Sequence, residues 1–150
     1  MSSVLIYNAR LINEGKSFTG SVLIENEFIV RVFREQPPAC LLEHCQVIDA
    51  TGLWLIPGII DEHVHFREPG LTHKGTIFSE SRAAVAGGVT AVMDMPNTLP
   101  RTIDNASWEE KMALFEENSL CHFSAYLGAT NDNLSFLEKA DYRRVCGVKV

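Results

Sequence analysis

Hydrophobic residues follow two different patterns along the chain. Up to about residue 52 they fall in short runs rich in β-branched and aromatic residues, which are separated by polar turns and by Pro37-Pro38. Such runs predict β-strands. The predicted strands of this region are Val4–Tyr7, Ser21–Ile24, Phe28–Phe33 and Gln46–Asp49. We therefore expect residues 1–52 to form a small, β-sandwich-like domain.

From residue 53 onward, strand-like apolar runs alternate with helical patterns. The predicted strands are 53–65, 89–95, 121–127 and a last one from 145, and the predicted helices are 76–86, 107–118 and 131–140. This alternation predicts an α/β fold with a parallel sheet covered by helices. An open doubly wound sheet usually carries a glycine-rich turn after its first strand, and none is present there. A (β/α)8 TIM-type barrel is therefore the expected architecture.

The length of the chain limits how much of such a barrel it can contain. A (β/α)8 barrel needs about 250 residues. The chain stops at Val150, inside an apolar run that predicts a fourth barrel strand. We therefore expect residues 53–150 to be the first part of the barrel, truncated in its fourth strand, and the chain to be the first portion of a longer one.

The helix predicted from Ser107 has the clearest local signals. Ser107 and Glu110 have the spacing of a capping box. Trp108, Met112 and Phe115 form an apolar stripe at helical spacing. We expect this stripe to pack against the sheet.

The charge and the cysteines exclude several classes of partner. The formal net charge is −6 and no basic cluster occurs, so neither nucleic acid nor an anionic membrane is an expected partner. No apolar run approaches the roughly 20 residues of a membrane span, and the N-terminus lacks the pattern of a signal peptide. The cysteines show no Cys-x-x-Cys spacing, which favours reduced thiols in a cytoplasmic protein.

His63 and His65 are the most informative residues of the chain. They lie at the end of a predicted strand, where side chains two residues apart point to the same face. Two imidazoles aimed at one point suit a shared metal ion, although two surface histidines have the same spacing. Asp61 and Arg67 share this parity, and burying four such groups without a purpose would be costly. We therefore interpret this strand end as a metal site.

Lys149 is the second unusual residue. Val148 and Val150 flank it in the last predicted strand, so we expect the valines to pack on the helices and Lys149 to point into the barrel. Beside two divalent cations its amine would capture carbon dioxide as a carbamate, an anion able to bridge them. The alternative is a lysine that keeps its ammonium group in water at the strand end.

Arg67 and Asn97 follow the first and second predicted barrel strands. A guanidinium binds a carboxylate through two hydrogen bonds, and an amide adds another. Because the carboxyl ends of barrel strands meet on one face, the two residues predict a small anionic substrate. The alternatives are that Arg67 pairs with Asp61 or Glu68, and that Asn97 only shapes the turn after Pro96.

Several segments resemble one known family. Asp61–Gly70 together with Asp94–Thr98 resembles the dihydroorotases, which are cyclic amidohydrolases of the amidohydrolase superfamily. Leu55–Asp61 and Ala86–Thr90 are similar to the approaches to the first and second barrel strands of that superfamily. The resemblance extends over all 150 residues.

This resemblance implies a function and a role for each candidate residue. His63 and His65 would bind the more buried of two zinc ions. Arg67 and Asn97 would hold the substrate carboxylate, and Lys149 would be the carboxylated lysine that bridges the metals. The general-base aspartate and the other ligands would lie beyond the last residue, so no catalytic residue is expected within this chain. The implied enzyme is a homo-oligomer that reversibly cyclises N-carbamoyl-L-aspartate to L-dihydroorotate in pyrimidine biosynthesis.

Three alternatives stay open. Allantoinases have asparagine at the position of Arg67, and hydantoinases lack the Phe66–Gly70 segment, but both act on cyclic amides. A non-catalytic, dihydroorotase-like scaffold subunit is another possibility, although such homologues often lose metal ligands and both His63 and His65 are present. Finally, some dihydroorotases bridge their metals with an aspartate, in which case Lys149 would not be a ligand.

Overall fold

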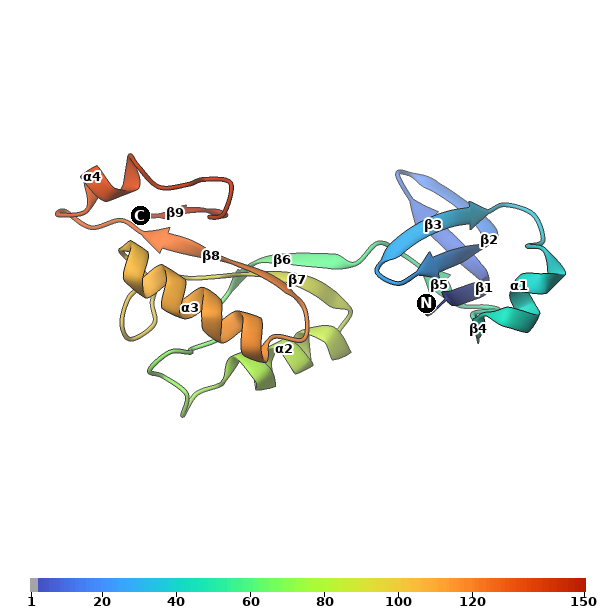
Figure 1. Ribbon diagram of the computed structural model, residues 1–150, viewed down its shortest axis with the longest axis horizontal. Helices are drawn as coiled ribbons and strands as arrows, with labels where there is room; N and C mark the ends of the chain where they lie inside the picture. The colour runs from blue at the N-terminus through green and yellow to red at the C-terminus, as the bar shows by residue number, and fades with distance from the viewer. Residues whose placement is uncertain (1–2) are drawn as a thin grey trace. The chain divides into compact units, whose positions relative to one another are not determined.

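The computed structural model describes residues 3–150, which fall into two compact units. The first unit ends at Pro57 and the second begins at Gly58. Figure 1 labels the helices and strands of both. Among residues 3–150, no helix combines the length and the apolar character needed to cross a membrane.

The N-terminal unit is built around one five-stranded sheet with the order β3-β2-β1-β4, in which β5 also pairs with β1. β1 runs antiparallel to β2 and parallel to β4. The strands are β1 (Ser3–Asn13), β2 (Lys16–Glu25), β3 (Phe28–Phe33), β4 (Gln46–Asp49) and β5 (Trp54–Leu55). Residues 3–57 form no second sheet, so the expected sandwich is not confirmed.

Two features of this unit differ from the sequence-based expectation. Helix α1 (Ala39–His44) lies in a region where only strands were predicted. β5 pairs with β1, which places residues 53–57 in the first unit and moves its end from residue 52 to Pro57. The sequence showed only an apolar run continuing toward the next strand, and pairing with β1 is a long-range contact that such a run does not reveal.

The second unit is an α/β fold with a parallel four-stranded sheet in the order β6-β7-β8-β9. Its strands are β6 (Ile59–Val64), β7 (Val89–Asp94), β8 (His122–Gly128) and β9 (Gly147–Lys149). Its helices are α2 (Ile77–Ala86), α3 (Asn105–Asn118) and α4 (Leu134–Leu137). Figure 1 shows α2 and α3 side by side on one face of the sheet. Because the strands are parallel, their carboxyl ends meet at one edge.

Two apolar clusters join the helices to this sheet. One consists of Phe66, Ile77, Val92 and Phe115. The other consists of Trp108, Met112, Ala125, Leu127 and Leu137. The stripe predicted from the sequence is thus buried, as expected. Burying each such large apolar side chain stabilises the folded state by roughly 1.5–3 kcal/mol.

Helix α3 starts earlier than the predicted capping box. Its N-cap is Asp104, whose carboxylate accepts the Ser107 N–H at 2.8 Å. The Ser107 hydroxyl in turn accepts the Asp104 N–H at 3.3 Å. The predicted box of Ser107 with Glu110 is therefore wrong, because Asp104 supplies the same spacing one turn upstream and leaves Ser107 as the third helical residue.

Helix α4 is shorter than the predicted helix over residues 131–140. The Asn133 side chain does not cap it. The amide of Asn133 donates instead to the carbonyl oxygens of Ile103 and Gly128 at 2.8 and 2.9 Å. A cap residue used for long-range contacts leaves the first helical N–H groups without this partner, which favours a short helix.

Replacing Asp104 with alanine is expected to lower the free energy of unfolding by about 1 kcal/mol, the usual effect of losing an N-cap. Hydrogen bonds from Ser107 hold the pKa of Asp104 below its ordinary value. The contribution is therefore present above the ordinary pKa of aspartate and is lost as the pH falls through the lower folded pKa. Denaturant unfolding at neutral and acidic pH measures this effect, with Asp104→Asn as a control that keeps a cap. If Asp104→Ala lowered the free energy of unfolding equally at both pH values, the charged cap would not explain the loss.

Candidate active site

Strand β6 brings two histidines to the carboxyl edge of the sheet. His63 is part of the strand, and His65 lies directly after it. Val64 and Phe66 pack into the apolar cluster with α2 and α3, so the histidines face the opposite side. The centroids of the two imidazole rings are 5.3 Å apart. The structure therefore brings the two rings together.

The pairing of β6 is irregular between Asp61 and the histidines. The pairing of β6 with β7 shifts register between Asp61 and Val64. Such an irregularity interrupts the two-residue alternation of a strand. Oδ1 of Asp61 accepts the N–H of His63 at 3.1 Å, so this carboxylate bonds to its own strand. The common face predicted for these residues is seen directly only for the two histidines.

Asn97 lies after β7 and contacts His65 directly. Oδ1 of Asn97 is 2.9 Å from Nδ1 of His65. An amide oxygen can only accept, so His65 donates from Nδ1 and keeps a free lone pair on Nε2. A partner on one ring nitrogen commonly orients a histidine that binds metal through the other. Within residues 3–150 the NH2 group of Asn97 makes no hydrogen bond and stays available as a donor.

Arg67 takes no part in this contact. Its guanidinium forms no hydrogen bond or ion pair with residues 3–150, and the side chain is half-buried. The carboxylate of Glu68 instead accepts the N–H of Ile77 at 2.8 Å, in the first turn of α2. The φ of Arg67 is 69°, so the extended strand conformation ends here and alternation does not set the direction of this side chain. The alternative pairings of Arg67 are not seen, which leaves its charge open to an anion.

Lys149 and Asn97 line one cavity of about 160 Å³. Val148 packs against the cluster of α3, which places Lys149 on the opposite face of β9. The lysine is exposed and forms no ion pair with residues 3–150. Asn97 thus contacts His65 and shares a cavity with Lys149.

Two histidines supply only part of a metal centre. Within residues 3–150 no group of three or more His, Cys, Asp or Glu side chains is arranged to hold a metal ion. Zinc sites need at least three protein ligands. The pair nonetheless fits a metal ion, because the ring centroids are only 5.3 Å apart and a His65 that donates from Nδ1 to Asn97 would present Nε2 to the metal.

Sequence reasoning missed two buried charged residues beside this site. Asp94 ends β7, and Lys111 lies on α3. Their side chains form an ion pair and are both 0% exposed. A signal was present, because Lys111 follows Trp108 by three residues on the apolar stripe of the helix. A lysine at such a position is buried only with a partner.

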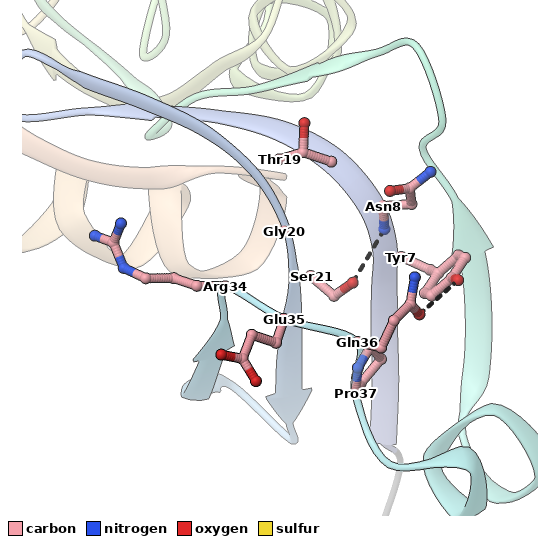
Figure 2. Close-up of a pocket in the computed structure, with 9 residues that line it drawn as sticks. All are labelled: Tyr7, Asn8, Thr19, Gly20, Ser21, Arg34, Glu35, Gln36 and Pro37. Carbon is pink, nitrogen blue, oxygen red and sulfur yellow. Dashed lines mark hydrogen bonds between the residues drawn. The ribbon is translucent and has the colours of Figure 1, made fainter.

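The N-terminal unit contains a separate cavity (Figure 2). Its volume is about 280 Å³, and residues of β1, β2 and the segment after β3 line it. The Tyr7 hydroxyl donates to Oε1 of Gln36 at 2.9 Å, and the Ser21 hydroxyl accepts the Asn8 N–H at 3.0 Å. These polar groups satisfy one another, and none of the predicted site residues lines the cavity. We therefore assign it no part in the site.

Comparisons with known proteins point to one family. The model of a family described as dihydro-orotase-like matches residues 52–131, more than half of the chain. The chain is 37% identical over 132 residues to a dihydroorotase of Methanosarcina acetivorans, a match covering 88% of this chain and 28% of that protein. It is 46% identical over 108 residues to a dihydroorotase of Carboxydothermus hydrogenoformans, covering 69% and 24%. It is also 36% identical over 150 residues to an allantoinase of Solibacter usitatus, covering 99% and 32%.

Solved structures share the fold. An L-hydantoinase (dihydropyrimidinase) from Arthrobacter aurescens matches with a TM-score of 0.89 and 26% identity, over 99% of this chain and 32% of that one. A dihydropyrimidinase from Brevibacillus agri matches with a TM-score of 0.75 and 23% identity, over 99% of this chain and 32% of that one. This second likeness shows a common fold alone. The chain spans about a third or less of the length of these relatives.

Proposed function

We propose, because this chain belongs to the dihydro-orotase-like family, that the intact protein is a dihydroorotase that opens and closes the ring of L-dihydroorotate. The observation that carries this proposal is the contact of Asn97 with His65, beside His63, at the strand ends. It supports the proposal because two imidazoles that could bind a metal ion lie next to a free amide donor. The dihydroorotases of Methanosarcina and Carboxydothermus among the relatives support the same activity.

The architecture of the intact protein follows the same reasoning. We propose that residues 58–150 form the first part of a (β/α)8 barrel, with its site at the carboxyl ends of the strands. The likeness to the Arthrobacter hydantoinase supports this. We also propose that the N-terminal sheet is half of a sandwich, because Phe28, Ile29 and Trp54 are exposed apolar residues that a second sheet would cover.

His63 and His65 are the chain's contribution to a zinc centre. A bound zinc ion supplies Lewis-acid chemistry to an amide carbonyl. His65 presents Nε2 because its Nδ1 proton is held by Asn97. Val64 and Phe66 anchor the segment in the core, so the histidines keep their positions when the substrate exchanges.

Arg67 and Asn97 are the chain's contribution to substrate selection. The guanidinium of Arg67 has no partner within residues 3–150, and the NH2 group of Asn97 is free. Together they offer charged and neutral donors to the carboxylate of dihydroorotate. A ring without that carboxylate would leave these donors unpaired, which disfavours its binding.

Lys149→Ala is expected to lower the zinc content and the activity of the intact protein. We propose that Lys149 would be carboxylated and would be a shared ligand of two zinc ions, since the negative charge of a carbamate would offset part of theirs. Metal analysis should show the loss of one zinc ion per chain, and a short carboxylic acid such as propionate should partly restore it. Full zinc content in the variant would favour a bridge by an aspartate from elsewhere.

The allantoinase of Solibacter usitatus among the relatives makes a second substrate worth testing. We expect the zinc-loaded intact protein to show a kcat/KM for dihydroorotate that exceeds those for allantoin and hydantoin by about a hundredfold or more. A preference for allantoin would contradict the proposal. A protein that holds zinc and opens none of these rings would be a non-catalytic scaffold.

A further inference from the structure

Asp94 and Lys111 form a fully buried ion pair behind the strand ends. Nζ of Lys111 is 2.6 Å from Oδ2 of Asp94, and both side chains are 0% exposed. Removing two charges from water costs several kcal/mol for each ion, and a buried pair often adds no net stability over apolar residues of similar volume. Stability alone therefore does not explain why α3 carries a lysine in its apolar stripe.

Each partner also holds the backbone of a different strand end. Oδ1 of Asp94 accepts the N–H of Phe66 at 2.9 Å. Nζ of Lys111 donates to the carbonyl oxygen of Met95 at 2.8 Å. Phe66 follows β6 and Met95 follows β7. The pair thus ties two neighbouring strand ends to each other and to α3.

These tethered segments carry the candidate site. Phe66 lies between His65 and Arg67, and Met95 lies two residues before Asn97. The hydrogen bond of 2.9 Å between His65 and Asn97 joins the same two segments. Because N–H···O bonds are seldom longer than about 3.2 Å, a shift of a few tenths of an ångström between the segments weakens this contact.

We propose that Asp94 and Lys111 are a positioning pair that sets the spacing of the two strand ends and thereby holds His65 in the tautomer that presents Nε2. The inference rests on the proposed function for the identity of the metal but not for the geometry of His65. Neither residue touches the substrate. Both act through the backbone at Phe66 and Met95.

Single replacements would not test this cleanly. Burial lowers the pKa of Lys111, and the attraction of Asp94 opposes part of that shift. Removing one partner leaves the other charge buried alone, which destabilises the fold by itself. Paired replacements remove both charges together, so they separate positioning from folding.

Two paired variants of the intact protein separate the tethers. Asp94→Leu with Lys111→Met removes both backbone contacts. Asp94→Asn with Lys111→Met keeps an oxygen that accepts the Phe66 N–H and loses only the contact with Met95. The matched control is Glu109→Gln, which removes the exposed 2.9 Å ion pair between α3 and Arg144.

Two measurements would change if His65 shifted, even in a variant that stays folded. The first is the zinc dissociation constant of the folded protein, measured by chelator competition. We expect it to rise by about 10–100-fold in the Asp94→Leu, Lys111→Met variant, as for other groups that orient metal ligands. A smaller rise is expected in the Asp94→Asn, Lys111→Met variant and none in the control.

The second readout is the tautomer of His65 in the metal-free protein, measured by nitrogen-15 NMR of labelled histidine. The wild type should show Nδ1–H, and the Asp94→Leu, Lys111→Met variant should show exchange between the two tautomers. A folded variant with wild-type zinc affinity and an unchanged tautomer would overturn the inference. If the wild type fails to open dihydroorotate, the proposed function fails, but the tautomer still decides whether the pair positions His65.

Discussion

The double variant His63→Ala, His65→Ala of the intact protein is expected to lose its more tightly held zinc and about a thousandfold or more of its kcat/KM for dihydroorotate. The two imidazoles lie close together at the end of β6, with ring centroids 5.3 Å apart. A Lewis acid contributes several kcal/mol of transition-state stabilisation, and each 1.36 kcal/mol corresponds to tenfold in rate. Metal analysis and steady-state kinetics on the same preparation measure both losses.

A matched double variant separates this effect from a general loss of histidine. His44 is the last residue of α1, and His122 is the first residue of β8, at the opposite end of the strands from the site. Both are exposed. Replacing both with alanine should leave the zinc content and kcat/KM unchanged. If the His63→Ala, His65→Ala variant kept its full zinc content, the two histidines would not be zinc ligands.

Arg67→Asn is expected to lower kcat/KM for dihydroorotate by about 30- to 5,000-fold while the zinc content stays unchanged. The guanidinium is half-buried and has no partner within residues 3–150. Truncating one member of a desolvated charge pair costs about 2–5 kcal/mol, which converts to that range of rates. The variant also places at position 67 the residue that allantoinases have there.

Substrates without a carboxylate provide the control for this prediction. Turnover of hydantoin, however slow, should change little in Arg67→Asn, because its ring offers no carboxylate to the guanidinium. Arg82→Asn changes an exposed arginine on α2 and should alter neither reaction. An equal loss of activity on both substrates would show that Arg67 supports the fold or the metal and does not read the carboxylate.

Much of the second unit could be predicted from local sequence patterns. Strand and helix alternate as expected, and Trp108, Met112 and Phe115 are buried along one stripe of α3. The closeness of the His63 and His65 rings also followed from local spacing. These features depend on residues close together in sequence, where the periods of strands and helices determine direction.

Long-range contacts could not be predicted in the same way. Asn97 was expected to read a carboxylate, but its bond to His65 joins residues 32 apart in sequence. Lys111 forms its ion pair with Asp94 only because α3 packs beside the end of β7. The register shift between Asp61 and Val64 was not foreseen either, because it depends on the pairing with the neighbouring strand. Pairing between elements decides such details, and periodicity does not report it.

Anomalous diffraction at the zinc absorption edge, from crystals of the zinc-loaded intact protein, tests the central claim most directly. That claim is a zinc centre held by the histidines that end β6. The account predicts an anomalous peak about 2.0–2.1 Å from a ring nitrogen of His63 and from Nε2 of His65, with Nδ1 of His65 still bonded to Asn97. Zinc peaks found only elsewhere, with the two imidazoles free of metal, would contradict it.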